Sequence, residues 1–171
     1  MIVRRERSAD AAELAQVIDA PFGDTDTSAF TQALRESAGY VPELTFVGEE
    51  DGELVGFTML SDVELDGHDR PVLILTPMAV RPDRQRRGVG VAIVQAAVAA
   101  ADERGEPLVL VEGVPAYYPR FGFRSASALG LEKPDERIPE DAWLALPLSA
   151  HDPSVRGRVV YPDFFPPPPG A

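Results

Sequence analysis

The chain of 171 residues has no cysteine and only two histidines, and these absences remove several classes of site. Without thiols there can be no disulfide framework, no cysteine nucleophile and no cysteine-ligated metal. His68 and His151 lie apart in polar segments, without the partners that a metal site or a Ser/His/Asp relay needs. We therefore expect no metal, and a chemistry carried by other residue types.

Long apolar runs are absent as well. No run approaches the roughly 18 apolar residues of a membrane-spanning helix. Residues Met1–Arg5 lead straight into charge, without the apolar stretch of a signal peptide. We therefore expect a soluble cytoplasmic protein with no membrane partner.

Basic residues are scarce: 16 stand against 28 acidic ones, which sets the net charge at −12. Such a chain repels nucleic acid, because binding a phosphate backbone depends on lysine and arginine. A local cluster of arginines inside this acidic background therefore stands out. The length and the hydrophobic content of 44% fit one domain. We expect that domain over residues 1–165, followed by an extended proline-rich tail at 166–171.

The N-terminal part of the chain shows alternating helix and strand signals. Apolar residues recur at helical spacing in two segments, and Asp51-Gly52 is a strong signal for a tight hairpin turn. The first predicted elements are a strand at 1–6 and a helix that is capped by Ser8 or Asp10 and stopped by Pro21. A second helix is predicted over 27–38, capped by Asp26 or Thr27 and ended by Gly39. Strands at 44–48 and 53–60 and a polar loop at 64–70 follow.

Two continuous apolar runs, Val72–Leu75 and Leu108–Val111, predict strands buried on both faces. Between them, a helix is predicted from Gly88 or Val89 to Arg104. Strand, helix and strand in this order predict a βαβ unit with parallel strands and a right-handed crossover. The apolar stripe of the helix is assigned to Val91, Val94, Val98 and Ala101. Further strands are predicted around 126–131, 143–148 and 158–161.

The loop Arg81–Gly90, which joins the first of these strands to the helix, holds four arginines and two glycines. A helix N-terminus has unpaired N–H groups and a partial positive charge, so this loop suits a phosphate or pyrophosphate. The alternative is that Gly88 only shapes the helix start and the arginines form a solvated surface. A Walker loop is excluded because its Gly-Lys-Ser/Thr is missing. A dinucleotide fingerprint is excluded because its third glycine is replaced by Ile93.

The motif Gln85-x-x-Gly88-x-Gly90, preceded by Met78–Pro82, resembles the acyl-CoA signature of the GNAT superfamily of N-acetyltransferases. The resemblance implies N-acetyltransferase activity with acetyl-CoA as co-substrate. In that family the backbone amides of this loop hold the pyrophosphate, and the preceding strand pairs with the pantetheine arm. By position, the cradle would comprise Gln85, Arg86, Arg87, Gly88, Val89 and Gly90, and the pantetheine and acetyl group would be lined by Met78, Ala79 and Val80.

The resemblance also implies the fold. We expect an α/β domain with a central mixed, mostly antiparallel sheet of six to seven strands, a splayed parallel pair and helices on both faces. Pro77 fits the bulge by which the family splays its strand, because proline cannot donate a ladder hydrogen bond. The alternative is that Pro77 ends the strand early.

A second motif, Tyr117–Phe123, follows the second parallel strand. In GNAT enzymes a tyrosine four residues before the Gly-Phe pair protonates the departing CoA thiolate, and that position is Tyr118. A phenol with a pKa of about 10 can protonate a thiolate of comparable basicity, whereas core packing is the alternative role. Together with Tyr161–Phe165, the pattern resembles the YhbS-like branch of predicted acetyltransferases. The chain departs from that branch at Gly113-Val114-Pro115, which lacks an aspartate, and at Glu112, where a small or apolar residue is usual.

Direct transfer to the amine is expected, since no thiol is present to form an acyl-enzyme. Glu112, at the end of a buried strand, is the best-placed candidate base, because burial raises the pKa of a carboxylate. The alternatives are that Glu112 pairs with Arg120 or Arg124, and that a bound water acts as the base. Oxyanion stabilisation is assigned to a backbone N–H near Ala79 or Val80.

Two other functions stay open: a non-catalytic acyl-CoA sensor, and an interaction domain whose basic loop binds another anion. The acceptor is expected to be a small-molecule or peptide amine, held by residues 22–40 and by the late loop 132–141. Acidic residues in and near the first of these segments favour a cationic amine. The sequence does not distinguish among amines, and it leaves a homodimer open.

Overall fold

The computed structural model describes residues 1–168, and their contacts divide into two compact units. The first unit comprises Met1–Ser61 and Thr76–Ala100, and the second comprises Asp62–Leu75 and the chain from Ala101 onward. Residues 169–171, the end of the tail expected at 166–171, lie outside the described residues. A single domain over 1–165 stays a prediction.

Antiparallel strands build the sheet of the first unit. Strand β1 (Ile2–Arg5) pairs with β2 (Tyr40–Glu50), which pairs with β3 (Glu53–Leu65). The hairpin turn between β2 and β3 is confirmed, with left-handed backbone at Asp51 (φ 52°) and Gly52 (φ 84°). Both strands are longer than predicted, and β3 takes in the first residues of the polar segment assigned to a loop.

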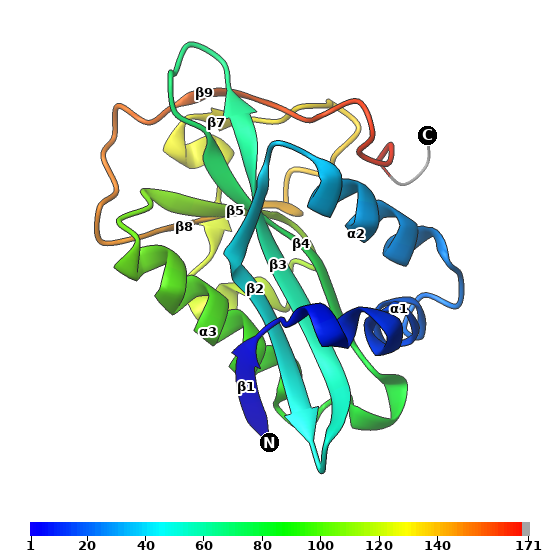
Figure 1. Cartoon of the computed structure of the whole chain (residues 1–171). Coiled ribbons are helices and arrows are strands. Elements are labelled where there is room, and N and C mark those ends of the chain that lie inside the picture. The colour runs from blue at the N-terminus through cyan, green and yellow to red at the C-terminus, as the bar shows by residue number, and fades with distance from the viewer. Residues whose placement is uncertain (169–171) are drawn as a thin grey trace. The chain divides into compact units, whose positions relative to one another are not determined.

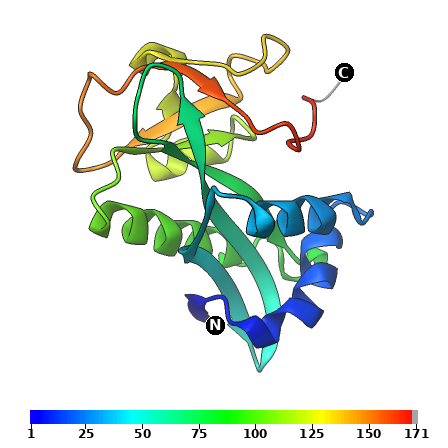
Figure 2. The same cartoon turned by 45° about the horizontal axis from the view of Figure 1, so that its top comes forward.

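Helices cover both faces of this sheet (Figures 1 and 2). A Cβ atom on Gly56 would lie 2.7 Å from Val89 Cγ1, at the start of α3 (Val89–Glu103). The guanidinium carbon of Arg35, in α2 (Asp26–Glu36), lies 5.5 Å from the ring centre of the next strand residue, Phe57. Successive strand residues point to opposite faces, so α3 packs on one face and α2 on the other. The predicted helices on both faces are therefore confirmed.

The helix caps differ from the prediction. The N–H and hydroxyl of Ser28, near the start of α2, donate to the carboxylate of Asp19 at 2.8 and 2.7 Å. Asp19 is the last residue of α1 (Ala11–Asp19), so one helix caps the other and the local caps Asp26 and Thr27 are wrong. Helix α2 ends at Glu36, before Gly39, because Ser37 is already extended.

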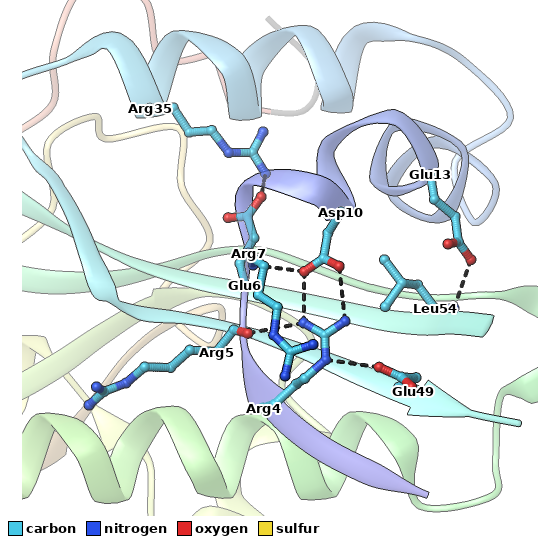
Figure 3. Close-up of polar contacts among 9 residues, drawn as sticks. All are labelled: Arg4, Arg5, Glu6, Arg7, Asp10, Glu13, Arg35, Glu49 and Leu54. Atoms are coloured by element: carbon cyan, nitrogen blue, oxygen red, sulfur yellow. Dashed lines mark hydrogen bonds and ion pairs between the residues drawn. The ribbon is translucent and has the colours of Figure 1, made fainter. Parts of the chain in front are cut away.

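A network of ion pairs holds the chain between β1 and α1 (Figure 3). The Asp10 carboxylate accepts hydrogen bonds from the Arg7 N–H at 2.7 Å and from the Arg4 guanidinium at 2.8 and 2.9 Å. Arg4 also binds Glu49 of β2 at 2.8 Å. Asp10 therefore folds back onto the turn before α1 (Ser8–Asp10, a 3-10 turn) and does not cap the helix that follows.

The second unit contains the predicted parallel pair. Strand β4 (Val72–Val80) pairs in parallel with β5 (Leu108–Glu112), with Leu73 opposite Val109 and Ile74 opposite Leu110. The parallel pairing is confirmed. Strand β4 continues through Pro77 to Val80, so the alternative that Pro77 ends the strand is wrong.

The remaining strands lie in the C-terminal part. Strand β5 pairs antiparallel with β8 (Trp143–Pro147), which also pairs with β6 (Arg124–Ser125). The strand predicted at 126–131 is wrong: a 3-10 turn at Ser127–Leu129 is followed by Gly130 with φ 82°, which reverses the chain. The last strands are β7 (Leu131–Glu132) and β9 (Gly157–Val160). Among residues 1–168, nine strands form the mixed, mostly antiparallel sheet, more than the six to seven expected, because two of them are only two residues long.

The core of the second unit forms around Trp143, which is fully buried and donates its indole N–H to the Leu131 carbonyl at 2.9 Å. Tyr161 and Phe165 pack against this core from the C-terminal segment. Among residues 1–168, no helix is long and apolar enough to cross a membrane.

Candidate active site

The loop predicted as a phosphate cradle bends sharply at two positions. After β4 the chain makes a 3-10 turn at Pro82–Arg84 and reaches α3 at Val89. Arg86 (φ 61°) and Gly88 (φ 87°) both have left-handed backbone, which is uncommon for a residue other than glycine. Turns of this kind can gather consecutive N–H groups into a concavity that binds anions.

The start of α3 leaves backbone donors available. The first hydrogen bond of the helix runs from the Ala92 N–H to the Gly88 carbonyl at 3.0 Å. The N–H groups of Val89, Gly90 and Val91 precede that bond and have no acceptor within the helix. They also lie at the positive end of the helix dipole, so the predicted cradle residues offer amide donors to an anion.

The arginines of this loop fall into two pairs. Arg81 and Arg84 are already bound to carboxylates, with the closest contact of each at 3.0 Å. Arg86 and Arg87 are exposed, and neither makes an ion pair with another residue of the described chain. The positive charge offered to a ligand therefore comes from Arg86 and Arg87. The carboxylates that hold the other pair belong to Glu50, Glu53 and Asp83.

The side chain of Gln85 ties the loop to the end of β4. Its Nε2 donates to the Val80 carbonyl at 3.1 Å. This bond fixes the turn that presents the cradle amides.

The end of β4 is held against β3 within the first unit. The Arg81 N–H donates to the Val55 carbonyl at 3.0 Å, and the Thr58 hydroxyl donates to the Pro77 carbonyl at 3.3 Å. Met78 packs at a small apolar cluster formed by Val55, Val80 and Val89. Ala79 is buried. The predicted pantetheine-lining residues Met78, Ala79 and Val80 thus adjoin the first residue of α3.

In the second unit, Tyr118 begins a 3-10 turn (Tyr118–Phe121) and exposes only 6% of its surface. Its ring lies 5.5 Å from that of Phe123 and 5.1 Å from that of Tyr117. Gly113 is required beside it, because a Cβ atom there would clash with the Tyr118 ring. The Tyr118 hydroxyl makes no hydrogen bond to another described residue. Burial raises the pKa of Tyr118, so the phenol keeps its proton.

Glu112 ends β5 and is half-buried. Burial raises the pKa of its carboxyl group, and the nearby charge of Asp135 adds to this effect. The Tyr161 hydroxyl donates to Glu112 Oε2 at 3.4 Å and opposes the shift. The predicted partner Arg120 instead donates to the Tyr117 carbonyl at 2.9 Å.

Tyr161 is the site residue to which sequence reasoning gave no role. The signal was present in the Tyr161–Phe165 motif, but its contact with Glu112 spans 49 positions of the chain. Within residues 1–168, no group of three or more histidine, aspartate or glutamate side chains is arranged to hold a metal ion.

Comparison with known proteins gives consistent matches. The sequence model described as the Acetyltransferase (GNAT) family matches residues 11–123. The uncharacterized N-acetyltransferase YjhQ of Escherichia coli K12 is 29% identical over 156 residues, covering 88% of this chain and 86% of YjhQ. The uncharacterized N-acetyltransferase YhbS of the same strain is 29% identical over 129 residues, covering 74% of this chain and 75% of YhbS.

Solved structures agree with these relatives. The crystal structure of Escherichia coli YhbS in complex with CoA superposes with a TM-score of 0.86 at 25% identity, over 95% of this chain and 90% of that one. A Brucella melitensis GNAT-family acetyltransferase in complex with acetyl-CoA gives a TM-score of 0.78 at 27% identity, over 96% and 97%. The predicted resemblance to the superfamily and to its YhbS-like branch is confirmed.

Proposed function

Because the chain belongs to the acetyltransferase (GNAT) family, we propose that it transfers the acetyl group of acetyl-CoA directly to a primary amine. The amine nitrogen forms a bond to the acetyl carbon, and the bond between that carbon and the CoA sulfur breaks. One proton leaves the nitrogen and one reaches the sulfur. The products are an N-acetyl amide and free CoA.

The observation that carries this proposal is the set of unused donors at the start of α3. The N–H groups of Val89, Gly90 and Val91 have no helical acceptor, and the exposed Arg86 and Arg87 have no carboxylate partner in the described chain. A pyrophosphate needs such a row of donors with cationic charge beside it. In support, YhbS and the Brucella melitensis relative bind CoA and acetyl-CoA, respectively.

The end of β4 supplies the next part of the proposed site. Met78, Ala79 and Val80 line the pantetheine arm and the acetyl group. A backbone N–H of Ala79 or Val80 stabilises the negative charge that develops on the carbonyl oxygen. This assignment is supported by the packing of Val80 on Val89, which makes the end of β4 adjoin the cradle within the first unit.

Proton transfer is assigned to two side chains of the second unit. Tyr118 donates its proton to the departing thiolate, and since burial raises its pKa, the phenol is in its protonated form before the transfer. Glu112 accepts the proton of the amine, directly or through a water. Its raised pKa makes it a stronger base than an exposed carboxylate, and no guanidinium is bound to it in the described chain.

The test is acetyl-CoA binding by calorimetry, followed by CoA release with a panel of amines. Arg86→Ala and Arg87→Ala should each weaken acetyl-CoA binding roughly two- to fivefold at low salt, as for exposed ion pairs, and less at high salt. Arg124→Ala is the control, since it removes an exposed arginine of the second unit and should leave binding unchanged.

Two results would count against the proposal. An absence of binding at millimolar acetyl-CoA contradicts it altogether. Binding without CoA release, for any amine of the panel, would instead assign the chain to the non-catalytic acyl-CoA sensors.

A further inference from the structure

A cavity of about 310 Å³ lies in the second unit, between β9 and the C-terminal segment. Its volume is at the lower end of the range for small-molecule sites. Three of its lining residues come from the late loop expected to hold the acceptor, and the others come from the segment 158–168. Those that carry the argument are Asp135, Arg137, Val160, Tyr161, Phe165 and Pro167.

The charged groups of this lining are already compensated. Arg137 binds Asp135 at 2.6 Å, and this contact lowers the pKa of the Asp135 carboxyl to about 2. Arg158 binds Glu136 at 3.4 Å. The cavity therefore offers no uncompensated cation to an anion, and no unpaired carboxylate to the several ammonium groups of a polyamine. What remains of the lining is valine, proline and aromatic surface.

The cavity is connected to the proposed base through Tyr161. The Tyr161 ring lies 4.5 Å from that of Phe165 in the lining, and its hydroxyl donates to Glu112 Oε2 at 3.4 Å. Asp135, also in the lining, lies near enough for its charge to act on Glu112. Glu112 lies outside the lining and is bonded to its Tyr161, and no guanidinium is bound to Glu112 in the described chain, so this carboxylate suits a single ammonium group, whereas the cavity walls suit a hydrocarbon group.

Building on the proposed function, we propose that this cavity binds the acceptor, and that the acceptor is a primary amine attached to an aryl or branched alkyl group. The hydrocarbon part lies against Tyr161, Phe165 and the prolines. The amine lies on the side of Glu112, which takes its proton. Burial of the hydrocarbon part provides the selectivity, because each methylene in such a pocket changes kcat/KM roughly 10- to 200-fold.

The experiment compares phenethylamine, ethylamine and spermidine in the wild-type chain and in Val160→Trp. Val160 is 41% exposed, so an indole there can fill the cavity without disturbing the core. Wild type should prefer phenethylamine to both other amines by at least about tenfold in kcat/KM. Val160→Trp should raise the KM for phenethylamine about tenfold or more and leave the KM for acetyl-CoA unchanged.

Ile2→Trp is the matched control, because Ile2 is 61% exposed in the first unit and accepts the same indole away from the cavity. It should change neither constant. The inference is overturned if wild type does not prefer phenethylamine, or if Val160→Trp leaves its KM unaltered.

A binding measurement separates this inference from the proposed function. Saturation-transfer NMR detects phenethylamine on the protein without acetyl-CoA, and the signal should disappear in Val160→Trp. Binding of this kind without any CoA release would support the cavity and contradict the transferase. CoA release together with phenethylamine binding that Val160→Trp does not affect would support the transferase and overturn the assignment of the cavity.

Discussion

Replacing Tyr118 by phenylalanine removes one hydroxyl group and leaves the ring in place. The ring contacts with Gly113 and Phe123 persist, and no hydrogen bond to another described residue is lost. The free energy of unfolding should therefore change by less than about 1 kcal/mol, because the group removed has no protein partner. For a chain of this size, that limits the change in Tm to about 2–4 °C.

The effect of Tyr118→Phe on turnover should be much larger. A positioned general acid contributes roughly 100- to 10,000-fold. Because a thiol ionises with a pKa of about 8.5, the thiolate also leaves without full protonation, and the loss should lie toward the lower limit. We expect kcat to fall about 100-fold, which corresponds to ~3 kcal/mol of transition-state stabilisation. The acetyl-CoA dissociation constant should stay unchanged, since the cradle belongs to the first unit.

The assay is continuous detection of free CoA thiol, with calorimetry for acetyl-CoA and a thermal melt for stability. Tyr117→Phe is the matched control, because Tyr117 is the adjacent tyrosine, and the Arg120 guanidinium carbon lies 4.5 Å from the centre of its ring. It should keep nearly full activity. A Tyr118→Phe variant with unchanged kcat and unchanged Tm would refute the reasoning and leave Tyr118 as a packing residue.

Three further outcomes are expected. Burial raises the pKa of Glu112, so kcat/KM should rise with pH as this carboxyl group loses its proton, at a pH above the ordinary 4.5. Glu112→Gln should abolish this rise, whereas the rise caused by deprotonation of the amine substrate should remain. Gly56→Ala places a methyl group 2.7 Å from Val89 Cγ1, so it should lower the free energy of unfolding in a denaturant melt by about 1–3 kcal/mol and weaken acetyl-CoA binding. Gly48→Ala places its methyl group 3.2 Å from the same atom, so both effects should be smaller. Asp19→Ala removes the cap of α2 and should cost about 1–2 kcal/mol, measured as a lower Tm without loss of acetyl-CoA affinity.

The elements predicted best from the sequence are those with a strong local pattern. The runs at Val72–Leu75 and Leu108–Val111 indicated buried strands, and the structure pairs them in parallel. The apolar stripe of α3 was only partly right: Ile93 and Ala97 are fully buried, whereas Val98 is half-buried. An alanine- and valine-rich helix has apolar residues on several faces, so its periodicity does not select the buried one.

The caps and the short strands could not be predicted because distant residues decide them. Asp19 caps α2 from the end of another helix, and this contact replaces the local candidates. Likewise, β7 pairs with β9 through Leu131 and Gly157, which are far apart in the chain. A pattern read from the residues around either segment cannot identify the distant residue that binds it.

In the candidate site, too, some features follow from local sequence and others depend on contacts between distant residues. The cradle follows from a contiguous motif, because amide donors at the start of a helix depend on a few neighbouring residues. The motif does not predict which of its arginines lack a carboxylate partner, since Glu50 and Glu53 of the β2–β3 hairpin form ion pairs with Arg84 and Arg81. The proposed acceptor side depends wholly on such distant contacts, as in the bond from Tyr161 to Glu112. A chain can therefore keep the local motif for a shared co-substrate while changes in its C-terminal segment alter the acceptor. On this reasoning, substitutions after β9 should change amine selectivity without changing the affinity for acetyl-CoA.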